Sequence, residues 1–363
     1  MTVDTAAIQR NLQLLLGRVA EDPENWDLRA DLFDAALAAG ALDIAEAEVK
    51  RALENHPDSA PWQHRWGVLL LGSKQYAAAQ RAFEGLVASG FRAPAILNNL
   101  AFALFRQGHV DAASQVLEPL LAVDDPDASV AWVLWLRCQH RLDRTSAALE
   151  RFRARVGQYP VPPEAFGVAS IMAADEERVD EARLWSDAAL RVRPDQMEAL
   201  ATKGTLALAG QDPEDAVGWF QRALEQNPDD GRCWSGVALA RVMSRDLPGA
   251  DVAFRKAVAT MPEHIGTWIA WGWCLFGMGR LPDAQRSFER ALEIDRNFSE
   301  SHGGLAVILA KLGRAEEAKR EIELAKGLDP KAMSAHYAEA ILSGKAEDPG
   351  YVAALASRAL RRR

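Results

Sequence analysis

Cysteine is scarce in this chain of 363 residues, and its three cysteines, Cys138, Cys233 and Cys274, lie far apart. An odd number without CxxC spacing argues against a disulfide framework and against a cysteine-based zinc site. A basic excess is also lacking, since the formal net charge is −9, and this argues against a general nucleic-acid binder. No stretch approaches the roughly 18 uninterrupted apolar residues of a membrane helix. We therefore expect neither nucleic acid nor membrane as a partner.

The N-terminal residues do not have the pattern of a secretory signal. Residues 1–23 contain a short leucine run, but no basic segment precedes it and polar residues occur throughout. Together with the scarce cysteine, this predicts a reducing, cytoplasmic location. The Ala-, Arg- and Leu-rich composition indicates a GC-rich bacterial source.

Motifs of common catalytic and cofactor sites are missing as well. The sequence has no GxxxxGK[ST], no GxSxG and no HExxH. Among the seven histidines, only His302 and His336 occupy positions from which two could meet, and ordinary helix packing accounts for both. We expect no enzymatic activity, no catalytic residue, no metal site and no cofactor.

A repeat of 34 residues runs along almost the whole chain. In each copy an alanine is followed four positions later by a residue that is mostly large and apolar, and seven positions later by a small or apolar one. The first alanines, with one step of 35, are Ala45, Ala79, Ala113, Ala147, Ala182, Ala216, Ala250, Ala284 and Ala318. Twelve residues upstream there is mostly a small residue, such as Gly67, Gly204 or Gly272. Small residues let two helices approach closely, so the pattern predicts nine antiparallel helix pairs.

The unit that starts at Ile265 shows the pattern most completely. Its framework residues are Trp268, Trp271, Gly272, Leu275, Ala284, Phe288 and Ala291. These residues and their spacing resemble the tetratricopeptide repeat family, over roughly residues 26–330. The resemblance implies an all-α fold, a right-handed superhelical solenoid of antiparallel helix pairs with capping helices at both ends. The unit from Ala128 departs most, because Trp135 stands in the small-residue position and Arg151 in that of the large apolar residue.

The repeats divide the chain into five expected segments. An N-terminal capping helix over 1–22 precedes a first block of repeats over 26–156. The extra residue falls in the proline-rich stretch 157–163, which predicts a stiff, extended connector. A second block covers 164–332. Residues 333–363 then form a degenerate repeat and a C-terminal capping helix, as a repeat stack needs at its end.

The resemblance also implies where a partner binds. In this family, peptides or partner segments usually bind the concave surface lined by the first helices of the pairs. By register, the positions that face it form an apolar groove rich in aromatic side chains. The predicted partner-binding residues are Asn98, Phe102, Phe105, Arg106, Trp132, Leu136, Gln139, Ile171, Leu239, Met243, Trp273 and Phe276. Packing between adjacent units is an equally good interpretation of Phe102, Trp132 and Trp273.

The sequence therefore predicts a non-enzymatic scaffold or adaptor that binds an apolar or amphipathic segment of another protein. Aromatic residues would supply most of the affinity, and Arg106 and Gln139 the orientation. A subunit that recruits a protein substrate to a partner enzyme is a second interpretation, and a peptide-signal sensor is a third. The carboxylate clamp and the asparagine ladder of some family members are disfavoured, because the neighbouring units lack the required residues. A basic cluster over 137–155 is either a solvated face or a contact for an acidic partner.

Overall fold

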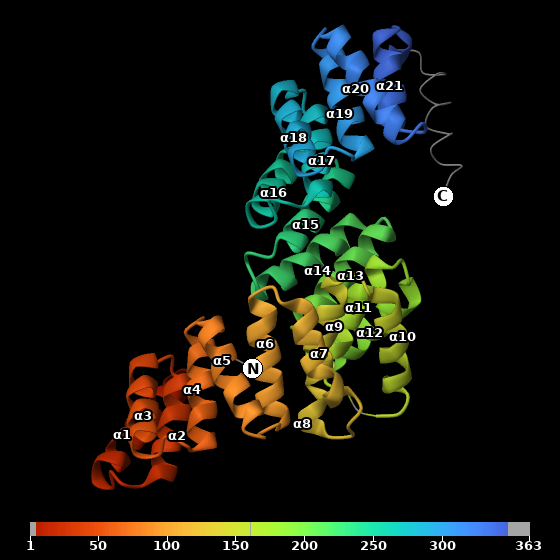
Figure 1. Cartoon of the computed structure of the whole chain (residues 1–363). Coiled ribbons are helices and arrows are strands. Elements are labelled where there is room, and N and C mark those ends of the chain that lie inside the picture. Colours follow the sequence, from red (N-terminus) through yellow and green to blue (C-terminus); the bar gives the residue numbers. More distant parts are fainter. Residues whose placement is uncertain (1–4, 160, 348–363) are drawn as a thin grey trace. The chain divides into compact units, whose positions relative to one another are not determined.

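A computed structural model describes residues 5–159 and 161–347, and in these residues all regular structure is helical (Figure 1). The chain divides into two compact units, Met1–Glu176 (unit 1) and Glu177–Arg363 (unit 2). The boundary falls in the turn between the two helices of one predicted repeat. The proline-rich stretch 157–163 thus lies inside unit 1 and does not separate the units. The predicted C-terminal capping helix falls within 348–363, outside the described residues.

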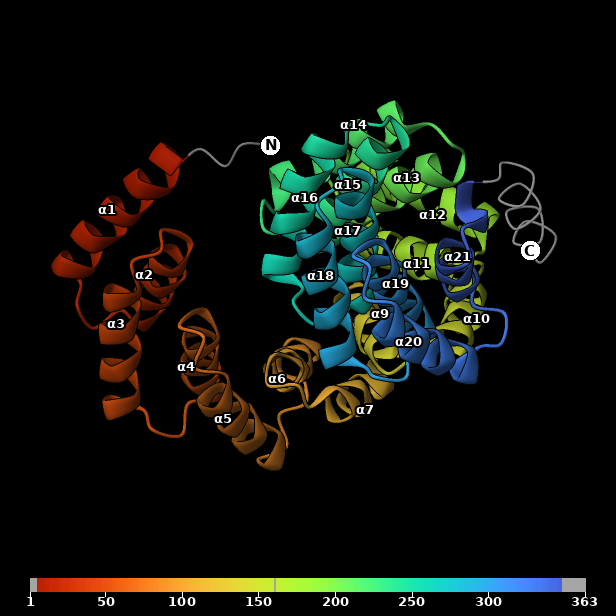
Figure 2. The same ribbon diagram turned by 90° about the horizontal axis from the view of Figure 1, so that it is seen from above.

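Unit 1 consists of an N-terminal helix, four helix pairs and the first helix of a fifth pair. Consecutive helices pack side by side, as Figure 2 shows for α4 with α5 and for α6 with α7. In chain order the helices are α1 (Thr5–Glu21), α2 (Trp26–Ala38), α3 (Leu42–Asn55), α4 (Ala60–Gly72), α5 (Tyr76–Ala88), α6 (Pro94–Arg106), α7 (Val110–Leu121), the short α8 (Pro126–Ser129), α9 (Ala131–Arg141), α10 (Thr145–Val156) and α11 (Pro163–Asp175).

Unit 2 continues the same alternation from the second helix of that fifth pair. Its helices are α12 (Val179–Val192), α13 (Met197–Ala209), α14 (Pro213–Gln226), α15 (Gly231–Met243), α16 (Leu247–Thr260), α17 (Ile265–Gly277), α18 (Leu281–Ile294), α19 (Ser299–Lys311), α20 (Ala315–Leu328) and α21 (Met333–Leu342), followed by a short 3-10 helix, η1 (Lys345–Glu347). Within the described residues, α21 is the first helix of the degenerate repeat that the sequence predicts.

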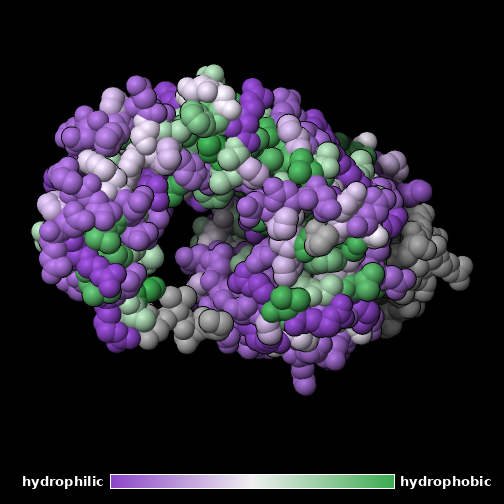
Figure 3. Space-filling view, turned by 90° about the horizontal axis from the view of Figure 1, so that it is seen from below, coloured by the Kyte–Doolittle hydropathy of each residue, from purple (hydrophilic) through white to green (hydrophobic). Residues whose placement is uncertain are grey.

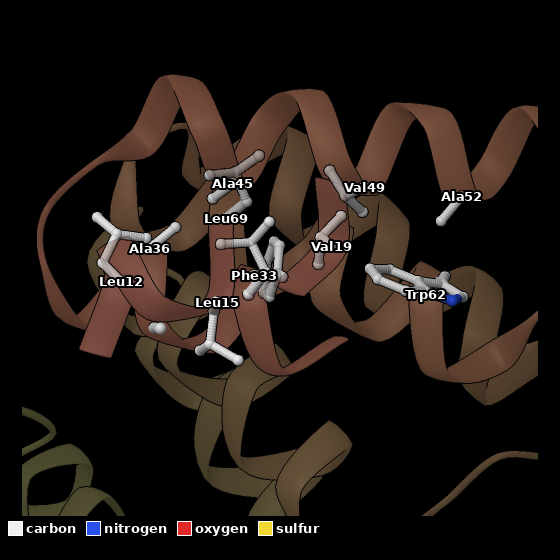
Figure 4. Close-up of a cluster of buried hydrophobic side chains, with 12 residues drawn as sticks. Leu12, Leu15, Val19, Phe33, Ala36, Ala45, Val49, Ala52, Trp62 and Leu69 are labelled. Atoms are coloured by element: carbon white, nitrogen blue, oxygen red, sulfur yellow. The ribbon is translucent and has the colours of Figure 1, made fainter. Parts of the chain in front are cut away.

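Helix α1 covers the start of unit 1. Its apolar residues Leu12, Leu15 and Val19 are buried against Phe33 and Ala36 of α2, in a cluster that α3 and α4 complete (Figure 4). Because the buried residues of α1 recur at helical spacing, one face of the helix is apolar and the other is solvated. The N-terminal helix therefore covers the core of the first pair.

Glycine and phenylalanine form the crossings at which the pairs of unit 2 pack. The ring of Phe288 is fully buried between Gly272 of its own pair and Gly304 of the next. A Cβ atom would lie 2.8 Å from the ring on Gly272 and 2.2 Å from it on Gly304. Phe220 is held in the same way by Gly204 and Gly236. The absence of a side chain on each glycine therefore makes the space that the ring fills.

Inside each pair, the chain turns through a residue of left-handed conformation. Glycine occupies this turn at Gly40, Gly108, Gly279 and Gly313, with φ between 71° and 84°. Residues with a side chain occupy it at Lys74, Asp143, Glu177, Gln211 and Arg245, with φ between 55° and 63°. A left-handed conformation costs such residues about 1 kcal/mol or more, so these five turns store strain.

Between pairs, the loop is tied to the helix that follows it. A side chain in the first turn of that helix lies at hydrogen-bond distance from the carbonyl oxygen six residues earlier. In the described part of the chain, five loops show this contact: Arg29 Nε to Pro23 (2.6 Å), Gln63 Nε2 to Pro57 (2.8 Å), Trp234 Nε1 to Pro228 (2.8 Å), Trp268 Nε1 to Pro262 (2.9 Å) and His302 Nε2 to Arg296 (2.9 Å). The type of the donor residue differs between the loops, whereas the acceptor is always the carbonyl oxygen six residues before the donor.

Candidate functional site

Unit 1 contains an apolar pocket of about 570 Å³ on the side of the first helices. On the face drawn in Figure 3, hydrophobic residues form small patches among hydrophilic ones, so no single large apolar patch marks a site on that face. The pocket is open to solvent and large enough for one or two side chains of a partner. It is lined by Phe33 and Asp34 of α2, by Ala60, Pro61, His64, Arg65 and Val68 of α4, by Phe91 and Ala93 of the loop before α6, and by Ala95 and Ile96 of α6.

Phe91 gives the pocket an exposed aromatic wall. Phe91 lies in the short loop between α5 and α6, and its side chain is 46% exposed. Opposite this loop, Val68 on α4 is half-buried and Phe33 is fully buried behind it. An exposed aromatic side chain beside an open apolar pocket is a typical contact residue for a partner.

The polar groups of the pocket are largely paired. Arg65 donates to Asp34 (3.1 Å), and its guanidinium carbon lies 5.1 Å from the centre of the Trp62 ring. Nε2 of His64 lies 3.2 Å from Nδ2 of Asn99. Burial lowers the pKa of His64 and the nearby Arg65 lowers it further, against an opposing effect of Asp34. The pKa of free histidine is already below 7, so His64 is neutral at pH 7 and adds no charge to the pocket.

A row of aromatic rings and arginines extends from the pocket toward the C-terminal end of α6. Phe102 and Phe105 are half-buried and Arg106 is exposed. The guanidinium carbon of Arg106 lies 4.7 Å from the centre of the Tyr76 ring, and that of Arg141 lies 5.1 Å from the centre of the Phe105 ring. Such cation–π contacts hold a guanidinium in place without consuming its N–H donors. We call the pocket together with this row the unit 1 groove.

Four of the predicted partner-binding residues lie on this groove-forming helix. Asn98, Phe102 and Phe105 are half-buried on α6, and Arg106 is exposed at its end. The repeat register predicts that these four side chains face the groove, and their partial or full exposure agrees with that position. What they bind stays a prediction.

The prediction is wrong for α9, whose expected groove residues are buried. Trp132 is 2% exposed, and its ring centre lies 5.4 Å from that of Trp135 and 5.9 Å from that of Phe152. Leu136 is fully buried, and Gln139 donates to Ser114 Oγ (2.7 Å) inside the core. The two tryptophans of α9 and Phe152 of α10 pack together in the core. These residues hold the pairs together and do not line a surface.

Ile171 on α11 is also buried, at 9% exposure. The whole segment from Gly167 to Ala173 is buried in unit 1, so helical register alone does not distinguish an inner face here. Ile171 is therefore a core residue rather than a groove residue.

In unit 2 the predicted residues differ in accessibility. Leu239 and Met243 on α15 are 39% and 43% exposed, as a groove-facing position requires. Trp273 and Phe276 on α17 are only partly exposed, because they pack against apolar residues of α19 and α21. Trp273 also lies 5.3 Å from Phe288, ring centre to ring centre. The pair Trp273 and Phe276 is thus mainly framework.

A half-buried carboxylate supports this framework. Glu300 accepts hydrogen bonds from Trp273 Nε1 (3.2 Å) and from Ser334 Oγ (2.8 Å). Burial raises the pKa of Glu300, although both hydrogen bonds act in the opposite direction. The carboxyl group joins α17, α19 and α21 by side-chain contacts that the repeat pattern does not reveal.

The sequence prediction missed the residues that form the pocket itself. His64 and Val68 stand at groove-facing positions of their repeat, so the register could have identified them. Phe91 lies in an inter-pair loop, where helical register has no meaning. Its signal was a large apolar residue in a turn between glycine and proline, at Gly90–Pro94.

The basic cluster over 137–155 is largely paired within unit 1. Its ion pairs are Arg144–Asp111 (3.0 Å), Arg151–Glu118 (2.8 Å) and Arg153–Glu150 (2.5 Å). Arg155 is buried and donates to the carbonyl oxygen of Val123 (3.3 Å). These contacts favour a structural and solvated role for these four arginines. Arg141, in the same stretch, forms no ion pair within the described residues and stacks on Phe105 instead.

No group of three or more histidine, cysteine, aspartate or glutamate residues within 5–159 and 161–347 is arranged to hold a metal ion. His302 contacts Glu321 instead (2.6 Å). The three cysteines are unpaired and buried, and burial raises the pKa of Cys138 to about 12 and that of Cys274 to about 11. None of the helices in the described part combines the length and the apolar content that a bilayer crossing requires.

Comparison with known proteins agrees with this architecture. The sequence profile described as tetratricopeptide repeat matches residues 13–64, 70–134 and 275–342, and a second profile with that description matches residues 173–231. Comparison with curated proteins returned no match.

Solved structures with a similar fold share little sequence with this chain. YrrB, described as a TPR protein with an unusual peptide-binding site, is 18% identical over 54% of this chain and 97% of its own (TM-score 0.41). The MamA protein is 16% identical over 47% and 92%, respectively (TM-score 0.40). A tetratricopeptide repeat protein from Parabacteroides merdae is 16% identical over 68% and 96% (TM-score 0.46). At these values the likeness concerns the fold alone.

Proposed function

This chain belongs to the tetratricopeptide repeat family, and on that basis we propose that it is a non-enzymatic scaffold or adaptor whose unit 1 groove binds an apolar or amphipathic segment of a partner protein. Proteins of this family are typically non-catalytic scaffolds for protein–protein interaction. What this chain itself binds is our inference from the groove.

The observation that carries the proposal is the open apolar pocket beside the exposed side chain of Phe91. A space of about 570 Å³ lined by Val68, Phe91 and Ile96 can take one or two apolar side chains of a partner. Burial of a leucine or phenylalanine side chain contributes about 1.5–3 kcal/mol. The half-buried rings of Phe102 and Phe105 extend the contact along α6. Together these residues can supply the few strong contacts on which a protein interface depends.

Photo-crosslinking tests where a partner binds. A photoreactive amino acid at Phe91 places the reactive group at the pocket wall, and one at Ala112, which is exposed on the second helix α7, serves as the matched control. In lysate of the source cells, we expect a discrete crosslinked protein at Phe91 and none at Ala112. Mass spectrometry of the crosslinked peptide then identifies the bound segment.

A variant with a charge in the pocket extends the crosslinking experiment. Val68→Glu would leave a carboxylate in the apolar wall and should abolish the Phe91 crosslink, because burial of an unpaired charge is costly. Ala112→Glu should leave the crosslink intact. Unchanged crosslinking in Val68→Glu, with helicity equal to that of Ala112→Glu by circular dichroism, would contradict the proposed binding site.

A further inference from the structure

Positive charge is left unpaired at one end of the unit 1 groove. Arg106 and Arg141 form no ion pair with any residue in the described part of the chain. Two carboxylates close to the groove are paired, in Asp34–Arg65 (3.1 Å) and Asp175–His140 (2.9 Å). The protein as a whole carries a formal net charge of −9, so the positive charge at this end of the groove is opposite in sign to the net charge.

Aromatic rings hold both guanidinium groups in place. Arg106 lies over Tyr76 and Phe102, at 4.7 Å and 5.7 Å from the ring centres, and Arg141 lies over Phe105 at 5.1 Å. A guanidinium that stacks on a ring keeps the planar set of donors that binds a carboxylate through two hydrogen bonds. Because the rings restrict the side chains beforehand, less conformational entropy is lost when an anion binds.

A structural role explains part of this arrangement. Arg106 and Arg141 are the last residues of α6 and α9, where a positive charge is favourable beside the negative end of the helix dipole. The dipole corresponds to only about half an elementary charge, and both arginines remain exposed. Each arginine can therefore serve its helix end and still bind a carboxylate.

The pocket and the arginines lie at a fixed spacing on one helix. Ala95 lines the pocket, and Arg106 lies eleven residues further along α6, which corresponds to about 16 Å at 1.5 Å per residue. An extended chain covers that length in about five residues. We infer that the unit 1 groove selects an extended segment of a partner protein that carries an acidic side chain about five positions from an apolar one. The inference rests on the proposed function and specifies its ligand.

Selection from a phage-displayed library of random peptides, about twelve residues long to cover this spacing, tests the inference with the full chain as bait. Peptides selected on the wild type should be enriched in Asp or Glu about five positions from an apolar residue. Fluorescence anisotropy of a selected peptide, acetylated and amidated, then gives its Kd. Arg106→Gln and Arg141→Gln should each raise this Kd about tenfold and weaken its dependence on salt. Arg81→Gln is the matched control, because Arg81 is an exposed arginine without an ion pair on the second helix α5.

The outcomes separate this inference from the proposed function. Selected peptides that are apolar but lack acidic residues, or a Kd unchanged in Arg106→Gln and Arg141→Gln, overturn the inference and leave the groove as an apolar binding site. Enrichment at a spacing of about eleven residues would indicate a helical ligand and also overturn it, as would binding only with a free C-terminal carboxylate. Failure to select any peptide, together with a negative crosslink at Phe91, would count against the proposed function itself.

Discussion

Replacement of Gly304 by alanine should destabilise unit 2, although alanine is the better helix former. The new Cβ atom would lie 2.2 Å from Cε1 of Phe288 and 2.6 Å from both Cδ1 and Cζ. Carbon atoms in contact prefer a separation of about 3.5–4.0 Å, so the ring or the helix would have to move by more than about 1 Å. The ring has little room to move, because it is fully buried and Gly272 holds its other side.

The size of the effect follows from two opposing contributions. Overpacking of a core costs about 1–3 kcal/mol, whereas a change from glycine to alanine inside a helix contributes about 1 kcal/mol of stability. The ring is held from both sides, so we expect the upper part of the overpacking range and a net loss of about 1–2 kcal/mol. The matched control is Gly218→Ala in α14, where no atom lies within 4 Å of the new Cβ. That variant should gain up to about 1 kcal/mol.

Urea unfolding followed by far-ultraviolet circular dichroism compares the midpoints of these variants, and hydrogen exchange shows whether the loss is local to α17–α19. Local unfolding has to be measured as well, because long repeat arrays do not always unfold in a single step. Phe288→Leu in the Gly304→Ala background should recover part of the loss, since a smaller side chain relieves the contact. If Gly304→Ala stabilised the protein as much as Gly218→Ala, the reasoning about the glycine–phenylalanine crossing would be refuted.

Two further predictions concern the strained turns and the half-buried carboxylate of Glu300. Lys74→Gly or Gln211→Gly should stabilise the protein by up to about 1 kcal/mol, because both residues have positive φ and glycine adopts positive φ without strain. A urea unfolding midpoint equal to or lower than that of the wild type would contradict this. Burial raises the pKa of Glu300, so the folded state favours the protonated carboxyl group. The stability that this group contributes is therefore present at acidic pH and decreases as pH rises through its folded pKa. Glu300→Gln should therefore gain stability relative to wild type as pH rises from 4 to 7, and a difference independent of pH in urea titrations would exclude this.

The repeat architecture was predictable from the sequence because the packing code is local. The spacing of alanine, phenylalanine and glycine specifies which residues meet at each crossing, as Gly272 and Phe288 do. The same code predicted the accessible positions of α6, including Phe102 and Arg106. The predicted alanine is buried in every copy except the fourth, where Ala147 is exposed and Ala148 is buried instead.

On α9 the predicted register is wrong by one residue: Ala148 and Phe152 of α10 are buried whereas Ala147 is exposed, so Ala148 and Phe152, and not Ala147 and Arg151, occupy the positions of the code. The left-handed turn residues Gly108, Asp143 and Glu177 place the extra residue before Asp143 rather than in 157–163. The expected groove residues of α9 were therefore assigned one position too early and lie in the core.

The remaining site residues depend on contacts that the register cannot show. Trp273 is partly buried because α19 and α21 pack over it, and the sequence of α17 alone does not contain that information. Phe91 belongs to a loop, where no periodicity assigns a direction to a side chain.

The hydrogen bonds that tie five of the loops to the helix that follows also bear on how the chain would open. The loop that precedes α17 is tied to that helix through Trp268 and Pro262, and Phe288 fills space in its own pair and in the next. A second helix, its loop and the following first helix are thus joined by contacts of their own, in addition to those that join the two helices of one repeat. Cooperative segments of this protein would then straddle the repeats seen in the sequence. Its natural breaking points would be the strained turns inside the pairs, such as those at Lys74 and Gln211.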